Sequence, residues 1–419
     1  MKMNFLLLFA CLFLLCGCRQ AFVEAYPIKT MEVAIDENSI IKFSDIYESV
    51  RFVRLETSDD YLVGHIDKLI ATDDKYIILD RTVANMIFVF NSDGSFSNRI
   101  GSIGRGPNEF DEPSDMAYDA HDDELLVLCH NLKAIYRFKL DGTFVGKTEM
   151  DWWVNSIYVV GEDACLLYFN NRIQPNKKKS SFNIVIINKE GAKLKELLPF
   201  NKNYGELSPP KPNFSSFQKE VLLTPYYFSK TYKLKDNIIE AKYSLDFKQH
   251  RIPEALLKNI TDKELDIIIR DNDYAFLIAL HETDTHIIGQ YVYRQVVYDF
   301  FYSKEIETMK SSSIYFNDMY ALLSGQSFRC LKGDSLISSI EPQFINYYKD
   351  LMGSISSNND IKDVLYNQYI RLPNTKMKDN IMKIIKSTDF MITDAEIDFI
   401  NSIDETDNQI LMIAKLRNF

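Results

Sequence analysis

Apolar positions along this chain come in short runs separated by polar turn residues, and one such pattern occurs twice. Residues 76–96 align without gaps with residues 124–144, so that Asp93-Gly94 falls on Asp141-Gly142. A weaker third copy ends at Glu190-Gly191. Short alternating runs that are joined by Asp-Gly turns are typical of β-hairpins. A repeat of roughly 40–50 residues built from such strands predicts a β-propeller.

The pattern also predicts how the ring closes. Further strand-rich units are expected at residues 156–198, 221–252, 274–306 and from about 314 onward, after those at 69–100 and 116–148. Residues 50–55 alternate before the first unit, and residues 410–416 form a last apolar run. When strands from the two ends of the chain share one blade, the ring has no exposed edge. We therefore expect these two segments in one sheet, and a propeller domain over residues 35–419.

Near the C-terminus the period changes from that of a strand to that of a helix. Phe344, Tyr347, Tyr348 and Leu351 follow helical spacing, with a proline at position 342 and a glycine at position 353. The sequence Thr393-Asp394-Ala395-Glu396 has the form of a capping box, as does Thr261-Asp262-Lys263-Glu264. The pattern predicts a helical insertion at about 342–403, followed by a closing strand at about 410–416.

The first residues indicate where the protein resides. Lys2 precedes the apolar stretch 5–15, which is too short to span a membrane and has the length of a signal peptide. The following Leu15-Cys16-Gly17-Cys18 resembles the lipobox of bacterial lipoproteins. We expect a signal peptide at 1–17, lipidation of Cys18 and a tether over 18–34. The predicted location is the cell envelope, lipid-anchored at the outer membrane, with the membrane side undetermined. An ordinary secretory signal is the alternative.

Charge and cysteine content narrow the classes of partner. The formal net charge is −11, which argues against nucleic acid and against electrostatic adhesion to anionic lipid. Beyond Cys18 the chain has Cys129, Cys165 and Cys330, an odd number without a C-x-x-C pair. We expect these three cysteines to be buried free thiols, and the alternative is that two of them form one disulfide. We therefore expect two kinds of partner. The N-terminal lipid would contact the membrane, and the propeller would bind an envelope protein, a peptide or a glycan.

Three further motifs carry a resemblance to known families. The stretch 101–110 reads G-S-I-G-R-G-P-N-E-F, the strand 53–57 reads V-R-L-E-T, and the end 407–411 reads D-N-Q-I-L. Together with the F-x-x-D-G-x-F turns, they resemble NHL-type propellers and the six-bladed β-propeller lipoproteins of bacteria. The resemblance implies an all-β fold with six blades. It assigns no catalytic residue to this chain.

Two loops contain candidate ligand contacts. Arg105 and Glu109 lie in the glycine-rich stretch, where backbone N–H groups and the guanidinium could contact an anion. The simpler interpretation is a tight crossover between blades that Glu109 and Phe110 hold in place. Trp152 and Trp153 follow the second unit and could form an aromatic platform for a sugar or a peptide. Their alternative role is packing between blades two and three.

A hairpin contains the weak candidates for a metal site. His281 and His286 flank a four-residue turn that includes Glu282 and Asp284, and two imidazoles across a hairpin could approach metal-ligand distance. No third ligand is evident, so a solvated turn is the simpler interpretation. A cofactor, if one binds, would be a divalent metal.

These observations favour a non-enzymatic binding module over two alternatives. The first alternative is a metal-dependent propeller enzyme similar to NHL-type lyases or gluconolactonase-like hydrolases, and the second is a structural envelope protein. Three or more carboxylates or imidazoles gathered in the channel would favour the enzyme. An apolar plug in the channel, with an aromatic patch outside, would favour the binding module. The sequence leaves the ligand and the oligomeric state open.

Overall fold

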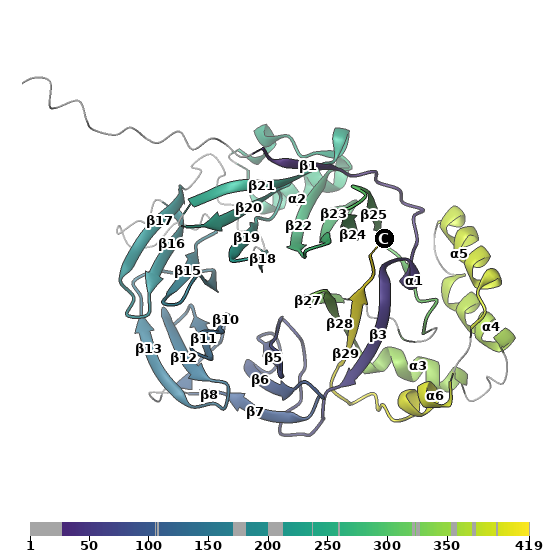
Figure 1. The fold of residues 1–419 in the computed structure, drawn as a ribbon, viewed down its shortest axis with the longest axis horizontal. Coiled ribbons are helices and arrows are strands. Elements are labelled where there is room, and N and C mark those ends of the chain that lie inside the picture. The colour runs from purple at the N-terminus through teal and green to yellow at the C-terminus, as the bar shows by residue number, and fades with distance from the viewer. Residues whose placement is uncertain are drawn as a thin grey trace, which may run out of the picture.

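The protein is a closed ring of six antiparallel blades (Figure 1). The computed structural model describes residues 27–104, 106, 109–170, 182–199, 213–236, 238–258, 260–320, 323, 327–352, 358–370, 374–390 and 393–418. The signal peptide, Cys18, most of the tether and Arg105 lie outside the described residues. None of the helices in the described ranges combines the length and apolarity that crossing a bilayer requires. The predicted fold, a six-bladed propeller with helices near the C-terminus, is confirmed.

The first three blades each contain four strands in sequence order from the channel outward. Blade 1 has β4 (Lys68–Ala71), β5 (Lys75–Asp80), β6 (Met86–Asn91) and β7 (Phe96–Ile100). Blade 2 has β10 (Asp115–Asp119), β11 (Glu124–Cys129), β12 (Ala134–Lys139) and β13 (Phe144–Glu149). Blade 3 has β14 (Ser156–Val159), β15 (Ala164–Tyr168), β16 (Phe182–Asn188) and β17 (Lys193–Pro199). The crossover between blades 1 and 2 contains β8 (Ser102–Ile103) and β9 (Glu109–Phe110).

The last three blades contain additions to this plan. Blade 4 has β18 (Asn213–Phe217), β19 (Glu220–Thr224), β20 (Lys230–Lys235) and β21 (Ile238–Asp246), with β1 (Lys29–Glu32) as a fifth strand. Blade 5 has β22 (Ala275–Glu282), β23 (His286–Tyr293), β24 (Val296–Ser303) and β25 (Met309–Ser312). Blade 6 has β27 (Ser327–Lys332), β28 (Ser335–Ile340), β29 (Ile410–Leu416) and β3 (Tyr47–Arg54).

Short elements and helices connect or flank the blades. β2 (Ile41–Lys42) and β26 (Tyr315–Phe316) form a small sheet. α1 (Phe43–Ile46) directly follows β2 in the chain. The 3-10 turns η1 (Lys248–His250) and η2 (Glu254–Leu257) lead to α2 (Asp262–Asp271). The C-terminal helices are α3 (Pro342–Met352), α4 (Asn358–Tyr369), α5 (Thr375–Ser387) and α6 (Asp394–Asn401), and they lie outside the ring beside blade 6 (Figure 1). Both predicted capping boxes are present, at α2 and at α6.

The expected tether is partly wrong, because its last residues belong to the propeller. β1 pairs in parallel with the outer strand β21 of blade 4. Met31 and Val33 are buried, so this segment covers apolar surface that would otherwise contact water. The alternation of apolar and polar residues over four positions was too short to distinguish a strand from an extended linker.

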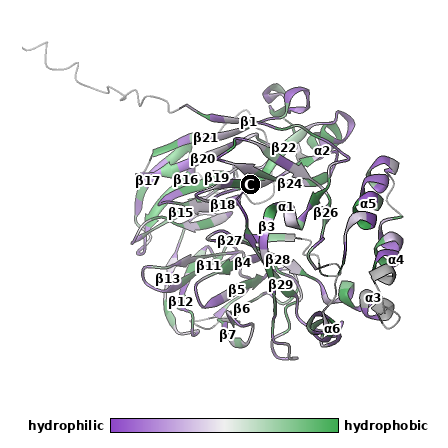
Figure 2. Ribbon diagram, turned by 45° about the vertical axis from the view of Figure 1, so that its right-hand side comes forward, coloured by the Kyte–Doolittle hydropathy of each residue, from purple (hydrophilic) through white to green (hydrophobic). Residues whose placement is uncertain are grey.

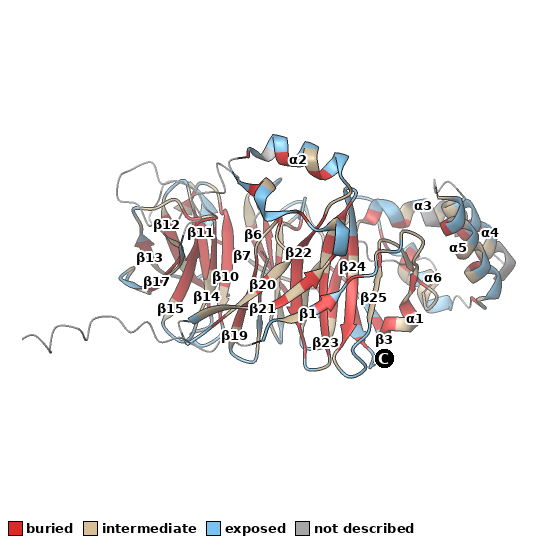
Figure 3. Ribbon diagram, turned by 90° about the horizontal axis from the view of Figure 1, so that it is seen from above, coloured by how far each residue is buried: buried red, intermediate tan, exposed pale blue. Residues whose placement is uncertain are grey.

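Hydrophobic clusters fill the spaces between neighbouring blades. In blade 1, Ile77 and Leu79 pack toward blade 2, whereas Tyr76 and Ile78 pack toward blade 6. Successive side chains of a strand point to opposite faces, so a blade between two others must be apolar on both faces. Figure 2 shows hydrophobic residues along the strands, and Figure 3 shows how much of each strand is buried.

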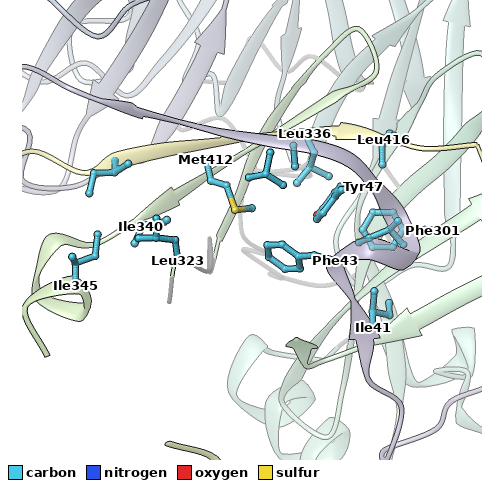
Figure 4. Close-up of a cluster of buried hydrophobic side chains, with 14 of the residues drawn as sticks. Ile41, Phe43, Tyr47, Phe301, Leu323, Leu336, Ile340, Ile345, Met412 and Leu416 are labelled. Carbon is cyan, nitrogen blue, oxygen red and sulfur yellow. The ribbon is translucent and has the colours of Figure 1, made fainter. Parts of the chain in front are cut away.

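The cluster between blades 5 and 6 also involves the segment that precedes β3. Phe43 and Tyr47 lie edge to face with ring centroids 5.2 Å apart, and Tyr47 contacts Phe301 of β24 in the same way (Figure 4). Met412 of the closing strand and Ile345 of α3 belong to the same cluster. This packing joins the N-terminal segment, the closing strand and the helical insertion into one core.

Two of the motifs that carried the family resemblance meet at the closure of the ring. β29 pairs antiparallel with β3, so the segments expected in one sheet do share it. Asp407 accepts a hydrogen bond from Arg54 at 2.6 Å. The buried Asn408 accepts from the backbone N–H of Val63 at 2.7 Å and donates to the carbonyls of Glu56 and Tyr61. One side chain therefore satisfies three backbone groups at the junction of blades 6 and 1.

Candidate functional site in the central channel

The inner strands β4, β10, β14, β18, β22 and β27 surround a cavity of about 1380 Å³ that residues of all six blades line. Because each blade has four antiparallel strands, every inner strand begins at the same end of the ring. α2 directly precedes an inner strand and marks that end, so we call it the α2 end (Figure 3). The opposite end, where the inner strands turn into the second strands, is the hairpin end. Both apolar and polar or charged side chains line the cavity, and apolar side chains do not fill it.

At the α2 end, a lysine and an aspartate connect three blades. Lys68 of β4 donates to Asp115 of β10 at 2.9 Å and to the carbonyl of Met116 at 2.7 Å. The second carboxylate oxygen of Asp115 accepts the backbone N–H of Ile157 from β14. Asp115 is nearly fully buried. Charge-assisted bonds in such a site are stronger than those at the surface, so this pair fixes the inner strands of blades 1 to 3.

Arg329 of β27 is a second cation at the α2 end. Its Nε donates to Ser339 Oγ at 3.0 Å, and its Nη1 donates to the carbonyl of Ile66 at 2.8 Å. Burial lowers the pKa of Arg329, while the more distant carboxylates of Glu341 and Asp67 act in the opposite direction. Its two hydrogen-bond partners among the described residues are both neutral oxygens.

The two histidines are buried, so the solvated-turn interpretation is wrong. His281 is 7% exposed and His286 is 1% exposed. Burial lowers the pKa of His281 to about 4, so its ring is neutral at pH 7. His281 contacts Asn213 of blade 4 and lies edge-on to Phe328 of blade 6, at 4.7 Å between centroids. The hairpin is part of the contact between three blades, which the polar sequence of its turn did not indicate.

The structure does not support a metal site at this hairpin. His281 contacts the neighbouring blades, whereas the Nδ1 atom of His286 lies 2.8 Å from Thr285 Oγ1 within its own turn. In the ranges that the structure describes, no group of three or more His, Cys, Asp or Glu residues is placed to hold a metal ion.

Glu282 lines the cavity and is paired with two lysines, which its position in a polar turn did not predict. Its carboxylate accepts from Lys242 of blade 4 at 2.7 Å and from Lys304 of blade 5 at 2.8 Å. Burial alone raises the pKa of Glu282, but the bonds from both lysines and from Tyr243 outweigh burial and hold the pKa below its ordinary range. The partners lie 40 and 22 residues away, so no local spacing could have revealed them.

Glu109 stabilises its own loop. Its carboxylate accepts the backbone N–H of Gly106 at 2.7 Å, and β9 pairs in parallel with β8. Phe110 is fully buried, and Gly101 has a φ of 72° with the Phe110 ring so close that a Cβ would lie 2.2 Å from it. These contacts fit the interpretation of the loop as a pinned crossover between blades.

The tryptophans and cysteines lie in structural positions. Trp152 is half-buried in the cluster between blades 2 and 3, where it lies edge-on to Phe169. Trp153 lies within 5.9 Å of the Lys133 ammonium, measured to the ring centroid. Cys129, Cys165 and Cys330 are free thiols, and the first two are buried. Burial raises the pKa of Cys165 and of Cys330 to about 12, so neither thiol is activated as a nucleophile.

The architecture places the protein among six-bladed β-propellers, and the chain belongs to a family within that class. Residues 27–415 match the family model described as a domain of unknown function (DUF4934). No curated protein matches the chain. The family assignment covers almost the whole described propeller.

Solved structures show the same fold. The chain is similar to a protein of Bacteroides fragilis NCTC 9343 that carries the provisional name of an exported protein, with a TM-score of 0.69, 17% identity, and coverage of 93% of this chain and 100% of that one. At that identity the likeness shows the fold alone.

Two more distant structures are a member of the duf4221 family from Bacteroides vulgatus ATCC 8482 and virginiamycin B lyase from Staphylococcus aureus. The first has a TM-score of 0.47 and 9% identity, and covers 70% of this chain and 91% of that one. The second has a TM-score of 0.37 and 11% identity, and covers 69% and 81%. Both are too distant to support a statement about this chain. The lipoprotein assignment and the NHL-type resemblance stay predictions.

Proposed function

We propose that this protein is a binding module whose ligand occupies the central channel. The observation that carries the proposal is the open cavity of about 1380 Å³, lined by polar and apolar side chains from all six blades. A volume of several hundred Å³ or more with a few convergent polar groups is the usual form of a small-ligand site. A peptide or a glycan segment has the size and the mixed polarity that this lining suits.

The walls of the channel are rigid, which favours selective binding. The Lys68–Asp115 pair connects blades 1 to 3, and Glu282 with its two lysines connects blades 4 and 5. A preformed site loses little conformational entropy when the ligand enters, so more of the contact energy appears as affinity. The ligand would therefore meet fixed polar groups.

Obstruction of the channel tests this function. Ser216 is exposed and lines the cavity, so Ser216→Trp places a large side chain in the channel. Ser97 is exposed on the outermost strand of blade 1, and Ser97→Trp is the matched control. Thermal shifts of the chain from residue 19 onward would be measured against short peptides and oligosaccharides. A ligand at a hundredfold over its Kd adds about 2.7 kcal/mol, which is visible as a higher midpoint.

Three results are informative. Stabilisation that Ser97→Trp retains and Ser216→Trp loses supports the channel as the binding site. Stabilisation that both variants retain places the ligand elsewhere and contradicts the proposal. A panel that stabilises neither the wild-type chain nor the control also counts against it.

We also propose that the propeller is held outside the cytoplasm by a lipid on Cys18. The apolar stretch 5–15 and the lipobox-like Leu15-Cys16-Gly17-Cys18 support this location, and so does the provisional name of the B. fragilis neighbour. Metabolic labelling with a palmitate analogue tests it. Cys18→Ala should abolish labelling, whereas Cys16→Ala should not, because Cys16 is not the acceptor. Labelling that survives Cys18→Ala would contradict the proposal.

A further inference from the structure

Arg329 differs from the other buried or half-buried cations beside the channel. Lys68, Lys242 and Lys304 each contact a carboxylate oxygen at 2.7–2.9 Å. For Arg329, no carboxylate of the described residues lies within ion-pair distance, and its bonds go to Ser339 Oγ and to the Ile66 carbonyl. A partly desolvated cation without an anionic partner interacts favourably with an anion that reaches it.

The two acidic side chains that act on the pKa of Arg329, Asp67 and Glu341, have partners of their own. Asp67 accepts from the backbone N–H groups of Arg81 and Thr82 and from the Thr82 hydroxyl, and it lies 3.6 Å from the Arg81 guanidinium. Glu341 accepts from the Gln409 side chain at 2.6 Å. They influence Arg329 only from a distance. The guanidinium of Arg329 is therefore half-buried in the channel wall, and no carboxylate of the described residues pairs with it.

Two nitrogens of the guanidinium are bonded to the protein, and the third is uncommitted among the described residues. Nε and Nη1 are bonded to oxygens of β28 and of the segment before β4, while Nη2 bonds to no described residue. Arg329 also lines the cavity. A guanidinium fixed in this way by neutral acceptors is preorganised for charge-assisted bonds to an incoming anion.

The acidic residues near Arg329 favour a ligand group with one negative charge over a group with two. Asp67 and Asp115 lie at the same end of the channel, and their carboxylates would repel a phosphate dianion. A carboxylate has a single charge and matches the geometry of a guanidinium. Apolar lining residues such as Ile70 and Ala117 follow along the inner strands and could contact the remainder of the ligand.

We infer that Arg329 anchors a carboxylate-binding subsite at the α2 end of the channel. The ligand presents a carboxylate to the guanidinium and extends toward the hairpin end. This inference rests on the proposed function, because it assumes that the channel is the binding site. The carboxylate belongs either to a uronate sugar or to a simple organic acid. Glutarate represents the second kind, since it has the carboxylate of an acidic peptide side chain.

Titration of the wild-type chain from residue 19 onward with sodium glucuronate and with glutarate tests the inference, with glucose and inorganic phosphate as comparison. Ionic strength is held constant because salt screens a single ion pair. We expect saturable binding of at least one carboxylate, weaker by at least tenfold in Arg329→Gln. Arg81→Gln is the matched control, since Arg81 lines the same end but already has Asp67. Arg329→Lys keeps the charge and should retain part of the affinity.

The outcomes separate the two proposals. Binding of glucuronate alone identifies a uronate, and binding of both acids identifies a simple carboxylate; either result supports the inference. The inference is overturned if neither acid binds, if phosphate or glucose binds as well as the acids do, or if Arg329→Gln binds like the wild type. The proposed function survives those results provided that some other ligand loses binding in Ser216→Trp. If no ligand responds to Ser216→Trp, both proposals fail.

Discussion

Blades 1–3 and blades 4–6 share one topology, but two of their buried carboxylates, Asp80 and Glu282, have different roles. In blade 1, Asp80 is fully buried and accepts backbone N–H bonds from Gly64, His65, Val83 and Ala84. In blade 5, the buried Glu282 instead accepts from lysines on two different blades. Asp80 thus shapes the turns of its own blade, whereas Glu282 joins two blades, as the buried Asp115 does among blades 1 to 3.

Blades 1–3 and blades 4–6 also differ in their outer hairpin turns and in the strength of the sequence repeat. The outer hairpins of blades 1, 2 and 3 turn at Gly94, Gly142 and Gly191, each with a positive φ. Gly94 is required, because a Cβ would lie 2.1 Å from the carbonyl oxygen of Arg54. In blades 4–6 the sequence repeat is weak.

Asn408, at the junction of the two halves, should show the largest effect. Asn408→Ala leaves the N–H of Val63 and the carbonyls of Glu56 and Tyr61 without their partner in a buried site. We expect a loss of about 3–5 kcal/mol in the free energy of unfolding, as two or three unsatisfied groups would give. Urea denaturation measures it. The exposed Asn131→Ala should change stability by under about 0.5 kcal/mol. Equal losses in both variants would show that Asn408 does not hold the junction.

The contrast between the halves can be tested on two buried glutamates. Glu282→Gln removes the charge that faces Lys242 and Lys304, so we expect a loss of about 3 kcal/mol. Glu124 of blade 2 lies 3.4 Å from Arg137 and 3.3 Å from Lys139, which are longer contacts. Glu124→Gln should therefore lose only about 1 kcal/mol. Thermal unfolding of both variants at pH 7 compares them, and a larger loss in Glu124→Gln would reverse the contrast.

A smaller effect than that of Glu282→Gln, and one of opposite sign, is expected at Asp299, which lies between blades 5 and 6. Burial raises the pKa of Asp299 to about 6, whereas hydrogen bonds from Gln290 and Tyr315 act in the opposite direction. The unfolded chain ionises near pH 3.9, so the folded state holds the proton more tightly. This contribution to stability is complete below about pH 4 and is lost as the pH rises through 6.

Asp299→Asn removes that dependence. At pH 8 we expect the variant to be more stable than the wild type by on the order of 2 kcal/mol, with no gain at pH 4. Melting temperatures of the two proteins across this range provide the measurement. A gain that is the same at both pH values would mean that ionisation of Asp299 is not the cause.

Much of the fold could be predicted from local pattern. The Asp-Gly turns located the outer hairpins, both capping boxes form, and residues 50–55 share a sheet with the last strand. These predictions succeeded because turn chemistry and alternation act over a few residues. The strand β1 and the burial of His281 and His286 were missed, since each depends on contact with a distant blade.

The candidate site was the least predictable part. Glu109 and Trp152 stood out in sequence as a loop acid and an aromatic residue, yet both have structural contacts outside the channel lining. Arg329 lies in an ordinary strand sequence with no motif around it. Its distinction is the absence of a nearby described carboxylate, which is a property of the assembled ring.

The sequence by itself determined the class of fold and the closing pair of strands, which follow from the spacing of apolar and turn residues along the chain. The number of blades and the expectation of a lipidated N-terminus came from motifs that resemble those of known families. Only the tertiary structure decided which side chains face the channel, which charges have partners and which histidines are buried. Those properties depend on groups brought together from six separate blades, and the pairing of charges across such distances leaves no period in the sequence.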